Sequence, residues 1–207
     1  MGRNKLQRFK ENEENKNVVQ DGKDIFKNVK GNWNKLQFDN EKPLVVELAC
    51  GRGEFTVGLA REYPEQNFIG VDIKGSRIWK GSKIALAEGL QNVAFLRTQI
   101  QLLDDFFSHG EVSELWITFP DPFPRDGDEK RRLTSPRYLE MYKPMIKSGG
   151  IVHFKTDNTG LFDYTLELVN SRPDIEVLAF THDFYQSEMR DDHHGIKTRY
   201  EKIFSDK

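Results

Sequence analysis

The sequence contains one cysteine, Cys50, and no group of cysteines and histidines with the spacing of a structural zinc site. A single cysteine excludes an internal disulfide. No apolar run reaches the about 18 residues that a transmembrane helix needs. The stretch Met1–Lys16 lacks the apolar core of a secretory signal, and no Ser or Thr follows Met1-Gly2 at the myristoylation position. These absences predict a cytoplasmic protein with neither a metal nor a membrane partner.

An excess of positive charge is also missing, because 31 Lys and Arg oppose 33 Asp and Glu for a net charge of −2. The protein therefore has no global field for nucleic acid, and any such contact needs a local basic patch. Apolar residues make up only 37% of the 207 residues. We expect one domain with a sizeable core over residues 43–207, preceded by a partly ordered polar arm over residues 1–42 with one helix near Asp24–Val29.

Apolar runs alternate with helical patterns from Pro43 onward. The patterns predict strands over residues 44–49, 67–73, 93–98, 114–120 and 149–156, and helices over residues 54–63, 76–89, 134–146 and 158–170. Strands that alternate with helices predict an α/β fold, a mostly parallel sheet with helices on both faces. Two later apolar runs, over residues 174–180 and 199–204, are expected to add an antiparallel edge.

A glycine turn follows the first of these strands, in the segment from Glu47 to Gly51 and Gly53. In this kind of fold the ligand lies at the carboxyl ends of the strands. A dinucleotide site would have a third glycine where Thr56 stands, so that fingerprint fails. Glu47 instead suits the ammonium group of S-adenosylmethionine, and Asp72, after the second strand, suits the two ribose hydroxyls. A plain strand-turn-helix joint remains the alternative.

The most informative segment places Asp121 among three prolines directly after the strand over residues 114–120. The prolines fix the backbone, so the carboxylate is presented in one orientation, as a preorganised site requires. Phe123 can stack beside a base. The run Lys130, Arg131 and Arg132 suits phosphates, although such a run alone is more often a solvated helix entry.

Together these segments resemble the bacterial tRNA (guanine-N7)-methyltransferases that modify the variable loop. The resemblance covers about residues 43 to 204, in VELACGRGEF, NFIGVDIKGSR, FPDPFP with EKRRLTSPRYL, GGIVHFKTDN and TRYEKIF. It implies a Rossmann-like class I methyltransferase fold with S-adenosylmethionine as cofactor. It also implies tRNA as partner, with methyl transfer to N7 of a variable-loop guanine.

The resemblance further implies roles for individual residues. Asp121 is implied as the catalytic residue and as a cofactor contact. The other implied cofactor contacts are Glu47, Gly51, Gly53, Asp72 and Gln99. The implied guanine contacts are Arg125, Asp157, Thr198, Arg199, Tyr200 and Glu201, and the implied RNA-binding stretch runs from Gly127 to Arg132 with Lys130, Arg131 and Arg132.

The sequence departs from the family at several of these positions. Ala49 stands where glycine is usual, Gln99 where an aspartate meets the adenine, and Phe123 where tryptophan is commoner. The segment Asp126–Asp128 replaces basic residues and so changes the charge of the RNA-binding stretch. Eight Lys or Arg among residues 1–30, against five Asp or Glu, can compensate.

Other readings stay open. The chain can be a methyltransferase for a non-tRNA substrate, or an RNA-binding protein without activity on a methyltransferase fold. The segment Asp191–Gly195, with two aspartates and two histidines, predicts a loop rather than a metal site. His153 is expected to be structural, Cys50 a small buried residue, and Trp79 and Trp116 part of the core. The number of copies in the assembly is left undetermined.

Overall fold

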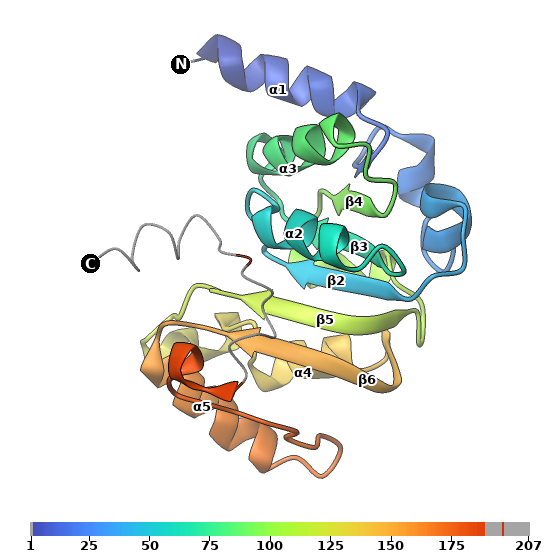
Figure 1. Cartoon of the computed structure of the whole chain (residues 1–207). Helices are drawn as coiled ribbons and strands as arrows, with labels where there is room; N and C mark the ends of the chain where they lie inside the picture. Colours follow the sequence, from blue (N-terminus) through green and yellow to red (C-terminus); the bar gives the residue numbers. More distant parts are fainter. Residues whose placement is uncertain (1, 189–195, 197–207) are drawn as a thin grey trace.

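The computed structural model describes residues 2–188 and residue 196. Six parallel strands form one sheet in the order β1-β4-β3-β2-β5-β6 (Figure 1). Their bounds are β1 Val18–Val19, β2 Leu44–Leu48, β3 Asn67–Val71, β4 Val93–Leu96, β5 Val112–Thr118 and β6 Ile146–Lys155. The chain runs outward from β2 to β4 and then returns to β5, so the order reverses between β2 and β5, where ligands of such folds bind.

Helices cover the sheet. The α-helices are α1 Gly2–Glu14, α2 Glu54–Glu62, α3 Gly75–Ala87, α4 Pro136–Tyr142 and α5 Thr159–Asn170. Short helices of other types are η1 Asp24–Lys27, η2 Asn34–Phe38, η3 Ile100–Asp105, η4 Asp126–Arg131 and η5 Phe184–Gln186. In Figure 1, α1 lies along α3, beyond the sheet end that carries β4. This architecture is the α/β fold with a parallel sheet that the sequence predicts.

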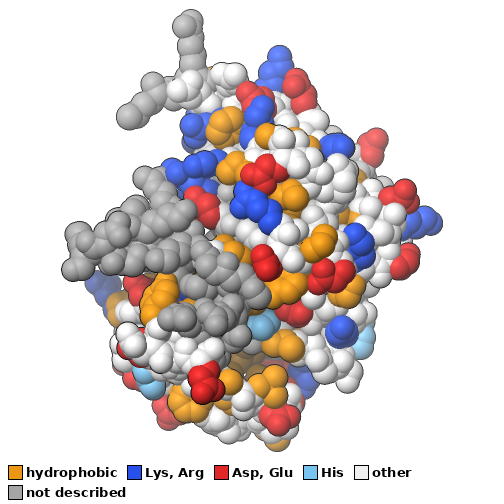
Figure 2. All heavy atoms as spheres, viewed as in Figure 1, with side chains coloured by type: hydrophobic (Ala, Val, Ile, Leu, Met, Phe, Trp, Pro, Cys, Tyr) orange, Lys and Arg blue, Asp and Glu red, His pale blue; other side chains and the backbone are white. Residues whose placement is uncertain are grey.

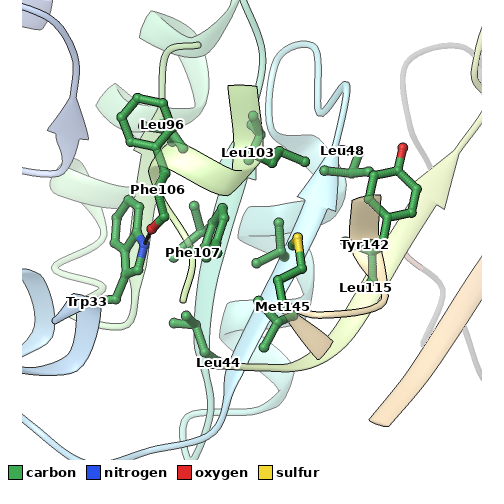
Figure 3. Packing of buried hydrophobic residues seen from close by; sticks show 14 of the residues in the cluster. Trp33, Leu44, Leu48, Leu96, Leu103, Phe106, Phe107, Leu115, Tyr142 and Met145 are labelled. Atoms are coloured by element: carbon green, nitrogen blue, oxygen red, sulfur yellow. Dashed lines mark hydrogen bonds between the residues drawn. The ribbon is translucent and has the colours of Figure 1, made fainter. Parts of the chain in front are cut away.

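Buried apolar side chains form one core on each face of the sheet. Adjacent residues of a strand point to opposite faces, so Val45 belongs to the core that contains Phe55 of α2, and Val46 to the core that contains Tyr142 of α4. The indole of Trp33 lies in the second core, where its Nε1 donates to the carbonyl of Phe106 at 2.8 Å (Figure 3). Each face of the sheet is therefore closed by its own layer of helices and loops.

The segment before residue 43 is more ordered than the expected arm. It begins with α1 and continues through β1, which extends the sheet beyond β4, and the helix expected near Asp24–Val29 is only the short η1. Val18, Val19, Val29 and Trp33 are fully buried in the two cores. The expectation of partial order was wrong because these few apolar residues find long-range partners. The boundary between residues 42 and 43 stays a prediction.

Two other expectations need correction. Residues 174–180, expected as an edge strand, form no strand, and the partner run over residues 199–204 lies outside the described residues. The helix expected over residues 134–146 ends at Tyr142, and β6 already begins at Ile146, with a register shift against β5 between Val112 and Glu114. Among the described residues, no helix is long and apolar enough to cross a membrane.

Candidate functional site

Glu47 lies in β2, at the point where the strand order reverses, and its carboxylate binds side chains of β5 and α2. Its Oε1 accepts a hydrogen bond of 2.8 Å from the hydroxyl of Thr118, near the end of β5. Its Oε2 accepts from the backbone N–H of Thr56 at 2.9 Å and from the Thr56 hydroxyl. A carboxylate offers about four acceptor positions, so about one remains for a ligand.

Glu47 is only 3% exposed. This burial raises the pKa of Glu47 from 4.5 to about 7, although the hydrogen bonds from Thr56 and Thr118 act in the opposite direction. The group is therefore poised between its neutral and ionised forms near neutral pH. A cation that binds beside it would favour the ionised form.

The glycine turn holds three residues with positive φ. Ala49 has φ of 54°, Gly51 of 59° and Gly53 of 70°. A Cβ at Gly53 would lie 2.4 Å from the ring of Phe95, so only glycine fits there. A Cβ at Gly51 would meet only the carbonyl of Ala49 at 3.9 Å, which leaves open space beside the turn. Ala49 adopts the left-handed conformation that the usual glycine would adopt without strain.

Asp72 directly follows β3 and faces the same turn. Its Oδ2 accepts from the N–H of Gly51 at 3.0 Å, and its Oδ1 accepts from the N–H of Lys74 at 2.7 Å. Both oxygens keep an acceptor position, as two ribose hydroxyls require. Ile73, the next residue, is a large apolar side chain that is 53% exposed, and Gln99 is exposed just before η3. Glu47, the glycine turn and Asp72 thus share one edge of the sheet.

The loop that carries Asp121 follows β5 and contains a strained residue on each side of Asp121. Phe119 has φ of 48° and Phe123 has φ of 43°, values that are rare for bulky side chains and cost about 1–3 kcal/mol each. Asp121 itself is exposed. The N–H of Phe119 donates to the carbonyl of Lys155 at 2.8 Å, which holds the start of the loop against the end of β6. Strain of this kind concentrates at functional sites.

The three cations of the basic run after the loop differ in exposure and in contacts. Lys130 is exposed, and the exposed guanidinium of Arg131 pairs with Asp128 at 3.1 Å and lies 4.2 Å from the ring centre of Phe123. Arg132 is only 9% exposed, and its Nε donates to the carbonyl of Phe123 at 3.1 Å. Its guanidinium lies 4.3 Å from the ring centre of Tyr164. A phosphate contact from Arg132, as expected from the sequence, conflicts with this burial.

The expected guanine contacts are placed only in part. Asp157 is exposed just after β6, whose last residue, Lys155, binds the start of the Asp121 loop, and Arg125 is exposed just before η4. Thr198, Arg199, Tyr200 and Glu201 lie outside the described residues, as does the segment Asp191–Gly195. Within residues 2–188 and residue 196, no group of three metal-ligating side chains occurs.

His153, expected as a structural residue, lies away from this edge. Its ring stacks on Trp116 at 3.8 Å between centres, and its Nε2 lies 3.2 Å from Oε2 of Glu114. These side chains line a cavity of about 240 Å³ together with Leu59, Tyr63, Gln66 and Phe68. Trp79 is only partly buried, and its Nε1 donates to Glu11 at 2.8 Å. Cys50 is buried as expected, and this burial raises the pKa of its thiol.

Some contributors to the site were missed at the sequence level. In the sequence, Thr56 indicates only that the third glycine of a dinucleotide site is missing. In the structure, both its backbone N–H and its hydroxyl donate to Glu47. Thr118 is the one polar side chain in the run Leu115–Thr118, and that break in an apolar strand is a usable signal. Ile73 could not be found in this way, because nothing in the sequence around it predicts that its side chain is exposed.

Comparison with known proteins gives consistent results. Residues 41–207 match a family described as "Putative methyltransferase". A tRNA (guanine-N(7)-)-methyltransferase of Cytophaga hutchinsonii is 49% identical over 205 residues, 99% of this chain and 92% of that protein. Proteins of the same name from Christiangramia forsetii and Bacteroides fragilis are 49% and 44% identical, over 98% and 100% of this chain and 92% and 82% of their own.

Proposed function

We propose that this chain, which belongs to the tRNA (guanine-N7)-methyltransferase family, transfers the methyl group of S-adenosylmethionine to N7 of a guanine in the variable loop of tRNA. The observation that carries the proposal is the strained, proline-bounded Asp121 loop beside Glu47 and the glycine turn. A tRNA substrate fits a cytoplasmic enzyme.

The residues present fit this cofactor. Asp72 keeps free acceptor positions for the ribose hydroxyls, and Glu47 keeps about one for an ammonium group. The open space at Gly51 allows a close approach to the backbone of the turn. Ile73 and Gln99 would contact the adenine, Ile73 by its exposed apolar surface and Gln99 through its amide oxygen. Bound there, S-adenosylmethionine supplies an electrophilic methyl group.

Asp121 would act by electrostatics rather than as a strong base. N7 of guanine has an exposed lone pair and no proton to lose, so the reaction chiefly needs correct positioning. The purine gains positive charge as N7 is methylated, and a fixed carboxylate stabilises that charge. Asp157 and Arg125 would hold the guanine, Asp157 by accepting hydrogen bonds from its N1 and N2 groups. Thr198, Arg199, Tyr200 and Glu201 remain proposed guanine contacts.

The RNA would be held by local charge. Figure 2 shows basic and acidic side chains mixed over the described part of the face that it displays, which agrees with the net charge of −2. Lys130 and Arg131 are the exposed members of the basic run, and Arg131 is paired with Asp128. Lys130→Gln should raise KM for tRNA. It should also reduce the magnitude of the slope of log K for tRNA binding against log salt concentration by about 0.7–0.9, the effect of one phosphate contact.

The decisive experiment is single-turnover methylation of bulk tRNA with saturating labelled cofactor, followed by mapping of 7-methylguanine. Asp121→Asn keeps the shape of the side chain and removes its charge, so the rate should fall by about 10²-fold. Asp105→Asn, a change of another exposed aspartate at the end of η3, is the matched control and should leave the rate unchanged. A rate for Asp121→Asn within a few-fold of the unaltered enzyme would transfer the role to Asp157.

A further inference from the structure

Phe123 is held by two arginines of the run that the sequence assigns to phosphate. The guanidinium of Arg131 lies over one face of its ring at 4.2 Å from the centre, and Nε of Arg132 donates to its carbonyl at 3.1 Å. Phe123 is also one of the two strained residues of the Asp121 loop, with φ of 43°. Such a conformation persists only where surrounding contacts fix it. The two arginines are contacts of that kind.

Arg132 is in turn anchored by α5. Its guanidinium lies on the ring of Tyr164, and the hydroxyl of Tyr164 donates to Oε1 of Glu129 at 2.6 Å. Burial, together with the hydrogen bond to Glu129, raises the pKa of Tyr164 to about 12, so the hydroxyl stays protonated and keeps donating. Nearby, the buried hydroxyls of Thr134 and Thr165 lie 2.7 Å apart and join the same segment to α5. These contacts hold Arg132 and its segment against α5.

We propose that Arg132 is a positioning residue, which holds the carbonyl of Phe123 and thereby fixes the Asp121 carboxylate for methyl transfer, rather than a ligand of RNA phosphate. The inference rests on the proposed role of Asp121. A planar guanidinium can stack on a ring and donate from Nε at the same time, and a lysine ammonium cannot do both. The charge of position 132 is therefore less important than its shape.

Arg132→Lys distinguishes a positioning residue from a phosphate ligand, because it keeps the positive charge and loses the planar guanidinium. A misplaced catalytic group costs rate rather than binding, so kcat should fall by about tenfold or more, with KM for tRNA and the salt dependence of tRNA binding unchanged. Arg132→Gln should lower kcat to a similar extent and also leave the salt slope unchanged. Arg137→Lys is the matched control, since Arg137 is an exposed arginine 5.9 Å from the ring centre of Tyr138 on α4, and it should leave kcat unchanged.

A double-mutant cycle with Asp121→Asn tests whether Arg132 acts through the loop. If it does, Arg132→Lys should cost much less in the Asp121→Asn enzyme than in the unaltered enzyme. Thermal unfolding of each variant, and cofactor titration, identify variants that have lost their fold. Tyr164→Ala, which removes the ring under the guanidinium, provides a second route to the same loss of kcat if the position 132 variants do not fold.

Two results would overturn the proposal. One is an unchanged kcat in folded Arg132→Lys; the other is a salt slope lowered by about 0.7–0.9 in Arg132→Gln with kcat retained, the behaviour of a phosphate ligand. If Asp121→Asn is silent while Arg132→Lys lowers kcat, the role given to Asp121 is wrong. If only Asp121→Asn lowers kcat, Asp121 keeps its role and Arg132 loses its own.

Discussion

The buried carboxyl of Glu47 should make the stability of the free protein depend on pH. In the unfolded chain its pKa is near 4.5, and in the folded protein burial raises the pKa to about 7. Below pH about 4.5 both states are protonated. As the pH rises, the unfolded chain loses its proton first, so the folded state becomes relatively less stable until the pH passes about 7. The contribution is fully present at low pH and is lost across this window.

The size of the effect follows from that window. One pH unit corresponds to about 1.4 kcal/mol, so the loss between pH 4.5 and about 7 is about 3 kcal/mol in the free energy of unfolding. Glu47→Gln removes the titration and keeps the shape. Its amide oxygen can accept from Thr56, and its NH₂ can donate to the hydroxyl of Thr118, so the local network survives.

Urea unfolding of both proteins without cofactor, at several pH values from 4.5 to 8, measures the effect. The difference in free energy of unfolding between the Glu47→Gln protein and the unaltered protein should shift by about 3 kcal/mol in favour of the variant as the pH rises through the window. Glu62→Gln, a change at an exposed position of α2, is the control. Parallel pH profiles for the Glu47→Gln and unaltered proteins would show that folding does not raise the pKa of the carboxyl and would refute the reasoning.

Three further perturbations follow from the structure. Asp72→Ala should weaken S-adenosylmethionine binding by at least about 1 kcal/mol in titration calorimetry, since a charged acceptor of two hydrogen bonds is lost; unchanged affinity would remove the ribose assignment. Ala49→Gly relieves a φ of 54° and should raise the free energy of unfolding by up to about 1 kcal/mol in urea; a loss of stability would contradict the strain. Trp33→Ala removes a fully buried indole and should cost about 3–5 kcal/mol by the same assay, and a cost under about 1 kcal/mol would mean that the segment before β2 contributes little.

The central strands were predictable from the sequence, because buried parallel strands read as continuous apolar runs between turns. The runs expected over residues 44–49, 67–73, 93–98 and 114–120 correspond to β2, β3, β4 and β5. The two-residue strand β1 was not predictable. It exists through its pairing with β4, in which the N–H of Phe95 donates to the carbonyl of Asn17, a contact that no local pattern encodes.

For the candidate site, the sequence predicted where the acidic residues lie in the sheet. Glu47, near the end of β2, and Asp72, just after β3, were located from the strand ends, because parallel strands present their carboxyl ends at one edge. The sequence could not show which hydrogen-bond partners each side chain has. Most acceptor positions of Glu47 are occupied by hydrogen bonds from Thr56 and Thr118. A run of cations likewise does not reveal that Arg132 folds back against Tyr164 while Lys130 stays exposed.

The shortness of β1 has a consequence for how the protein behaves in solution. An open strand at the border of a sheet offers unpaired N–H and C=O groups to other chains, and it is a common origin of aggregation. β1 covers this border of β4 with only two residues, Val18 and Val19, which are both fully buried, and α1 packs along α3. A protein shortened to begin at residue 43 would uncover the flank of β4 together with the apolar surface beneath it. The N-terminal segment therefore covers a border of β4 that would otherwise be open to other chains.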